Sequence, residues 1–141
     1  MGARSTGRER ALQALYQLEQ NGALTQAAAL EAAWSAADDE GPRDPSAHAF
    51  TAELIEGVVS YSTDIDSLIE EHSHNWRVDR MQRIDRNVIR LGAFELKYRH
   101  DIPRKVTINE AIELGKKYGT EDSAAFINGL LDRVALAVGK S

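Results

Sequence analysis

The sequence contains no cysteine among its 141 residues. This absence excludes a disulfide framework, a thiolate metal site and a cysteine nucleophile. No apolar run approaches the roughly 18 residues that a membrane-spanning helix needs, and the N-terminal stretch MGARSTGRER lacks the apolar region of a signal peptide. We therefore expect a cytoplasmic protein that has no contact with a membrane.

Strand-like runs of alternating Val, Ile and Thr are also missing, and only three prolines occur. Alanine, leucine and glutamate are abundant, and apolar residues recur at helical spacing. A chain of this length fits a single domain, residues 1–141, with a core of its own. We predict an all-α fold of about seven helices. The first four helices are expected over about residues 7–20, from an N-cap at residue 25 to about 34, about 45–61, and 65–72. The fifth is an arginine-rich helix that ends near residue 100. The last two are expected over 107–118 and about 120–138.

Three local signals predict where helices begin and end. Thr25 is a typical N-cap residue. The stretch TINE has the form of a capping box, in which Thr107 accepts from a backbone amide and Glu110 reaches back. Gly119 is placed as a left-handed stop. The stretches DDEGPRDP and HSHNW are predicted to separate helices.

Signatures of catalysis are scarce. The stretch GLLDRVALAVGKS ends in Gly-Lys-Ser, but it lacks the first glycine of a phosphate loop and a preceding strand. His72 and His74 are two residues apart and do not share a helical face, which disfavours a metal site. We predict no enzymatic activity, no cofactor and no metal.

Charge is distributed unevenly along the chain. Residues 11–75 contain twelve acidic side chains against Arg43 alone, a formal charge of −11. Residues 76–106 contain nine basic and four acidic side chains, a charge of +5, and the first ten residues carry +2. Such asymmetry favours a nucleic-acid partner or a charged protein partner. An equally favoured alternative is that the acidic and basic parts of the chain neutralise each other within the fold.

Four arginines of the stretch DRMQRIDRNVIRLG are spaced by three, three and four residues: Arg80, Arg83, Arg86 and Arg90. On one helix this spacing would gather them within about a third of the circumference. Such a stripe could hold carboxylates or phosphates bidentately. The alternative is pairing within the chain, for example between Asp79 and Arg83 at i,i+4. The sequence leaves both open.

The basic N-terminal segment is a second candidate for binding phosphates. Arg4 and Arg8 are four residues apart and would lie together on a helix that reached back so far, whereas Arg10 would point elsewhere. Tyr16 and Phe126 are candidates for stacking on unpaired bases. Packing in the core is the favoured alternative for each of these two aromatic residues.

Several linked motifs resemble one known family. They are RERALQALYQLEQ, Asp-x-Pro-x-Lys-Val followed by Asn-Glu-Ala, Tyr-Gly-x-Glu-Asp-Ser, and Phe-Ile-Asn-Gly. Together they resemble the NusB family of transcription antitermination factors over nearly the whole chain, most closely over residues 84–134. The resemblance implies two packed helical subdomains, about 1–62 and 63–141, and a non-enzymatic protein. It also implies pairing with the ribosomal protein NusE, binding of boxA RNA in ribosomal-RNA leaders, and assembly with an RNA polymerase antitermination complex.

The resemblance further implies which residues bind. The expected RNA-binding residues are Arg4, Arg8, Tyr16, Asp122 and Phe126. The expected partner-binding residue is Asp85, and Arg86 and Arg90 are added from their location beside it. The family's arm is often a run of consecutive arginines, which Ser5, Thr6 and Gly7 interrupt here. We therefore expect fewer phosphate contacts and predict that the partner supplies part of the RNA surface.

Two other interpretations are compatible with the sequence. The first is an RNA-binding accessory domain related to rRNA methyltransferases, although we take the end of the sequence at Ser141 to leave no room for a cofactor-binding domain. The second is a protein-binding helical adaptor whose surface is the acidic segment 11–75. A homodimer is possible, and the sequence does not predict the oligomeric state.

Overall fold

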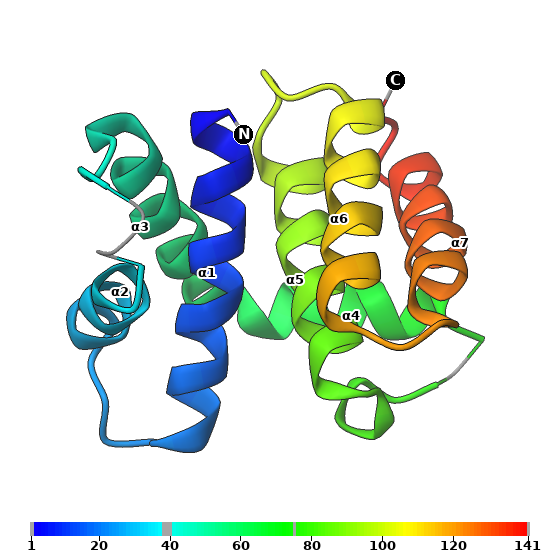
Figure 1. Ribbon diagram of the computed structural model, residues 1–141. Coiled ribbons are helices and arrows are strands. Elements are labelled where there is room, and N and C mark those ends of the chain that lie inside the picture. The colour runs from blue at the N-terminus through cyan, green and yellow to red at the C-terminus, as the bar shows by residue number, and fades with distance from the viewer. Residues whose placement is uncertain (1, 38–40, 75, 141) are drawn as a thin grey trace. The chain divides into compact units, whose positions relative to one another are not determined.

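The computed structural model describes residues 2–37, 41–74 and 76–140, and every regular element within these ranges is helical. This confirms the predicted all-α fold. Within these ranges the chain forms seven α-helices and one 3₁₀ turn, and Figure 1 labels the α-helices. They are α1 (Ala3–Gln20), α2 (Gln26–Ser35), α3 (Pro45–Ser60), α4 (Ser62–His72), η2 (Val78–Arg80), α5 (Arg83–Tyr98), α6 (Arg104–Tyr118) and α7 (Ser123–Ala137).

The chain divides into two compact units between α3 and α4. Unit 1 is Met1–Ser60 and unit 2 is Tyr61–Ser141. Each unit has a set of fully buried apolar side chains, such as Leu54 in unit 1 and Ile127 in unit 2. None of the helices in the described ranges is both long and apolar enough to cross a membrane.

In unit 1, α1 packs against α2 and α3, and the contact with α3 explains a glycine. A Cβ atom at Gly7 would lie 3.0 Å from the carbonyl oxygen of Ala47 and 3.0 Å from the ring of Phe50. Thr51 accepts a hydrogen bond from the indole nitrogen of Trp34 (3.2 Å) and donates one to the carbonyl of Gly7 (2.9 Å). These contacts hold the backbone at Gly7 inside α1. The helix begins at Ala3, so the predicted start near residue 7 is wrong.

In unit 2, α5, α6 and α7 run side by side and α4 crosses them (Figure 1). A Cβ atom at Gly92 would lie 2.7 Å from Leu131, so glycine permits the close approach of α5 and α7. The carboxylate of Glu95 is 1% exposed and accepts a hydrogen bond from the Thr107 hydroxyl at 2.9 Å. A buried carboxylate is tolerated where such donors satisfy it.

The predicted cap at Thr25 is confirmed, the capping box at Thr107 is wrong, and Gly119 is confirmed as the residue at which α6 stops but not as a left-handed one. The Thr25 hydroxyl accepts from the amide of Ala28 at 3.1 Å, as expected of an N-cap. Thr107 does not cap a helix, because α6 already begins after Pro103 and the Thr107 hydroxyl is used by Glu95. Gly119 has φ −93° and is not left-handed. A side chain there would instead collide with Ser123, which explains the glycine sterically.

The arginine-rich segment is not one helix. The turn η2 ends at Arg80 and α5 begins at Arg83, so the predicted four-arginine stripe is wrong for Arg80. Asp79 does not share a helix with Arg83 and instead forms an ion pair with Arg77 at 3.0 Å. The predicted end near residue 100 is also shifted, since α5 ends at Tyr98.

The sequence predicts three further separations between helices, and the structure describes one of them fully and two in part. Between α3 and α4 only Tyr61 is non-helical, so the predicted break before residue 65 is much shorter than expected. The loop at DDEGPRDP includes residues 38–40, and the HSHNW separator includes Asn75; these four residues lie outside the described residues. The described part of the second stretch is non-helical after His72.

Candidate nucleic-acid interface

The basic N-terminal segment is the first part of α1, and its arginines lie on aromatic rings. The guanidinium carbons of Arg4 and Arg8 lie 5.4 and 5.3 Å from the centroid of the same Phe50 ring. This confirms that the two arginines lie together. Arg10 instead lies over Trp34 at 5.7 Å, which confirms that it points elsewhere. Cations at such distances are attracted by the π face of the ring.

Arg4 and Arg8 differ in burial although they share one ring. Arg4 is exposed, whereas Arg8 is 3% exposed. Burial against Phe50 gives Arg8 a packing role in addition to its charge. Arg4 is the one of the two whose charge faces solvent and can meet a phosphate directly.

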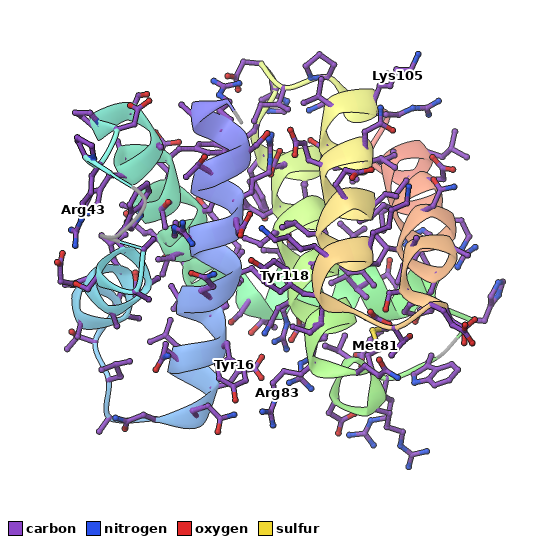
Figure 2. The ribbon with its side chains drawn as sticks, in the orientation of Figure 1. Tyr16, Arg43, Met81, Arg83, Lys105 and Tyr118 are labelled. Carbon is purple, nitrogen blue, oxygen red and sulfur yellow. The ribbon has the colours of Figure 1, made fainter. Side chains whose placement is uncertain are left out.

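Tyr16 lies in the C-terminal half of α1, where Figure 2 labels it. Its side chain is 43% exposed, so the favoured alternative of core packing is wrong for this residue. An exposed phenol ring is suited to stacking on a base.

Asp122 and Phe126 lie one helical turn apart at the start of α7. Asp122 is the exposed N-cap residue, and Phe126 is half-buried. The Phe126 ring lies 6.3 Å from the ring of Trp76, with the two planes tilted by 55°. Trp76 is 55% exposed and was not identified from the sequence. The available signal was a tryptophan followed directly by an arginine in a polar stretch.

Asp85, which is expected to bind the partner, is nearly buried. It is 7% exposed and lies in the first turn of α5, where the helix dipole favours a negative charge. Its Oδ1 atom is buried and accepts no hydrogen bond from the described part of the chain. A buried acceptor of this kind is costly to leave unsatisfied.

The two arginines beside Asp85 differ. Arg86 is half-buried. Arg90 donates from Nε and Nη2 to the two carboxylate oxygens of Asp66, at 2.9 Å each, and from Nη1 to Asn87 at 3.3 Å. Pairing with the chain's own acids, the alternative left open by the sequence, therefore holds for Arg90.

The expected site residues fall in both units. Arg4, Arg8 and Tyr16 belong to unit 1, and the other five belong to unit 2. Within unit 1 the structure brings Arg4 and Arg8 together on one ring, and within unit 2 it brings Phe126 against Trp76. Within the described ranges no cluster of three or more His, Asp or Glu side chains could hold a metal ion.

Comparison with known proteins gives consistent matches. The sequence pattern of the NusB family matches residues 5–136. The transcription antitermination protein NusB of Myxococcus xanthus (strain DK1622) is 70% identical over 140 residues, which cover 99% of each chain.

Solved structures agree with this match. The structure of T. maritima NusB superposes with a TM-score of 0.82 and 36% identity, covering 94% of this chain and 90% of that one. A chain from a crystal structure of the antitermination factors NusB and NusE in complex with dsRNA gives a TM-score of 0.81 and 26% identity, covering 96% and 97%. The chain belongs to the NusB family.

Proposed function

We propose that this protein is a cytoplasmic transcription antitermination factor without enzymatic activity. It binds boxA RNA of ribosomal-RNA operon leaders together with the ribosomal protein NusE, and it acts within an RNA polymerase complex that reads through terminators. The observation that carries this proposal is the 70% identity to an antitermination protein over 99% of both chains. A related protein crystallised with NusE and dsRNA supports both partners.

The proposed RNA contacts follow from the chemistry of the five expected residues. Arg4 is exposed and binds phosphate, while Arg8, held on Phe50, contributes charge from a fixed position. Tyr16 and Phe126 stack on bases. Asp122 is exposed and accepts hydrogen bonds from base edges. Phosphate contacts supply affinity and base contacts supply selectivity.

The proposed NusE contact is centred on Asp85. The Asp85 carboxylate would have to turn outward to meet a donor from NusE, and because its buried Oδ1 accepts no hydrogen bond from the described residues, that turn breaks none at this atom. Arg86 lies next to it in the chain, and Arg90 lies one turn beyond Arg86 on α5, where Asp66 orients its guanidinium. Hydrogen bonds to charged groups contribute about 1.5–3 kcal/mol, so loss of this contact is expected to weaken NusE binding measurably.

The function is tested by fluorescence anisotropy with labelled boxA RNA in single-stranded and double-stranded form. The titration is run with and without equimolar NusE at two salt concentrations, on monomer and any homodimer separated beforehand, because a homodimer could cover the RNA face. We expect single-stranded RNA to bind more tightly with NusE and less tightly at higher salt. Absence of binding to either RNA form, with a folded monomer, would contradict the proposal.

Two matched variants refine this test. Arg4→Gln should weaken RNA binding, whereas Arg43→Gln removes the same charge from another part of unit 1 (Figure 2) and should not. Equal effects of the two would mean that only total charge matters.

The partner contact is tested by a pair of neutral variants. Asp85→Asn should weaken NusE binding without RNA by about 10- to 100-fold, measured by calorimetry. Asp122→Asn should leave NusE binding unchanged and weaken RNA binding. If both variants affect NusE equally, the assignment of Asp85 is wrong.

A further inference from the structure

Trp76 is an unusual residue on the surface of unit 2. It lies between α4 and η2, and 55% of its side chain is exposed although tryptophan is on average highly buried. Beside it lies a hollow of about 370 Å³ lined by four residues: His74, Trp76, Arg77 and Arg80. Three of these four can carry positive charge, so the hollow combines an aromatic ring with cations.

The backbone amide and carbonyl of Trp76 both form hydrogen bonds. The Ser73 hydroxyl donates to the carbonyl of Trp76 at 2.7 Å, and the amide of Trp76 donates to the carbonyl of Ser73 at 3.1 Å. Two residues later, the amide of Val78 donates to the carboxylate of Glu70 at 2.9 Å. The backbone that carries the indole is therefore fixed at Trp76 and at Val78, which lowers the entropy cost of binding a ligand.

Phe126 supports the indole from α7. The ring centroids are 6.3 Å apart and the planes are tilted by 55°, a common geometry for a stabilising aromatic pair. Because the planes are not parallel, a flat ligand would not fit between them as a sandwich. It would stack on the exposed part of the indole instead.

The two arginines at the hollow are accessible. Arg77 pairs with Asp79 at 3.0 Å, but both side chains are 64% exposed. Exposed pairs of this kind contribute little stability, so another anion can replace the carboxylate. Arg80 is exposed and has no side-chain hydrogen bond or ion pair with any other described residue. Both guanidinium groups can therefore turn towards a phosphate.

We propose that Trp76, Arg77 and Arg80 form a subsite for one unpaired RNA nucleotide, whose base stacks on Trp76 and whose phosphate meets the arginines. An aromatic ring for the base and guanidinium groups for the backbone are the combination that single-stranded nucleic acid requires. A docked protein would need a far larger contact area than a single indole in a small hollow. The inference rests on the proposed RNA-binding function and adds a contact beside Phe126.

The test measures the affinity of the full chain with NusE for single-stranded boxA RNA by anisotropy. Trp76→Leu should raise Kd by about 5- to 150-fold, which is the range for losing one base–aromatic stack. Trp76→Phe keeps a π face and should keep most of the affinity. Tyr61→Leu, which removes another exposed aromatic residue of unit 2, is the matched control and should leave Kd unchanged. Circular dichroism checks that each variant is folded.

The arginine contribution is measured from the salt dependence. Arg80→Gln should make the slope of log K against log salt shallower by about 0.7, the value for one phosphate contact with a single strand. Lys105→Gln removes the same charge at the opposite end of unit 2 from Met81 (Figure 2) and should leave the slope unchanged.

Tryptophan fluorescence gives a readout independent of affinity. Trp34 is 4% exposed, so Trp76 is the tryptophan that a soluble quencher reaches. Bound RNA should quench the emission and shield it from acrylamide, and Trp76→Phe should abolish both changes.

The outcomes separate this inference from the proposed function. If the wild-type protein binds boxA RNA and Trp76→Leu binds equally well, the subsite is wrong and the function stands. If Trp76→Leu weakens NusE binding in the absence of RNA and leaves RNA binding intact, the hollow is a protein contact and the inference is overturned. If the wild-type protein binds no RNA with or without NusE, both the function and the subsite fail.

Discussion

The arginines of α1 and those of residues 77–90 look alike in the sequence but have different surroundings. In unit 1, Arg4 and Arg8 lie over Phe50 and Arg10 lies over Trp34. In unit 2, by contrast, Arg77 and Arg90 pair with the carboxylates of Asp79 and Asp66. Arg8 and Arg10 are buried, whereas Arg77 and Arg80 are exposed.

The difference shows how one residue type contributes to folding in one place and to binding in another. A guanidinium packed on a ring buries apolar surface and cannot be removed without loss of packing. A guanidinium in an exposed ion pair gains little from it and can exchange its carboxylate for another anion. We therefore expect substitution of the buried Arg8 and Arg10 to affect stability, and substitution of the exposed Arg77 and Arg80 to affect mainly binding.

Removing the shared ring should have the largest effect. Phe50 is 5% exposed and contacts α1 at Gly7. Phe50→Ala should lower the free energy of unfolding by about 3–5 kcal/mol, because it leaves a cavity and removes the surface under two arginines. Urea denaturation measures this. Phe126→Ala, at a half-buried ring, is the matched control, and an equal loss there would remove the contrast between the two units.

The next largest effect separates the two arginines on Phe50. Arg8→Ala should destabilise the protein by about 2 kcal/mol, because a desolvated cation–π contact is lost together with its packing. Arg4→Ala should cost only about 0.5–1 kcal/mol, because this side chain is exposed. Thermal and urea unfolding compare the two variants. Equal losses would mean that burial does not distinguish them.

A smaller effect is expected for the ion pair between Asp66 and Arg90. A double-mutant cycle with Asp66→Ala and Arg90→Ala should give a coupling energy of about 1 kcal/mol or less. The coupling should fall as salt is added, because the pair is partly exposed. A coupling as large as the loss from Arg8→Ala, or one insensitive to salt, would contradict the contrast with α1.

The smallest effect concerns Tyr98 at high pH. Burial and a hydrogen bond to the Asp64 carboxylate raise the pKa of Tyr98 to about 12, from an ordinary value of 10.0. The neutral phenol therefore contributes stability below pH 10, and this contribution is lost as the pH rises from 10 to about 12. Absorbance titration should show a tyrosine that ionises near pH 12, and Tyr98→Phe should remove that step.

The same tyrosine is linked to an acid. Hydrogen bonds from Lys97 and Tyr98 hold the pKa of Asp64 below its usual value. In Tyr98→Phe the pKa of Asp64 should rise towards normal, which NMR titration can follow. No change in this pKa would show that Lys97 alone is responsible.

Each error in the sequence-based predictions has an identifiable structural cause. Thr107 has the pattern of a helix cap, but burial against Glu95 uses its hydroxyl in the interior of unit 2. The arginine spacing predicts one continuous helix, yet the chain is extended at Met81 between η2 and α5. Trp76 carries no periodic signal, and only its exposure and its neighbours indicate a binding role.

The sequence by itself determined the all-α class, the cap at Thr25 and membership of the NusB family, because helical periodicity, capping and family motifs are properties of residues close together in the chain. The tertiary structure alone decided which arginines lie on rings and which pair with acids. Arg90 meets Asp66 across 24 residues of sequence, and Arg8 meets a ring on a different helix. Such contacts depend on which helices pack together, and this packing places the guanidinium groups in their different environments.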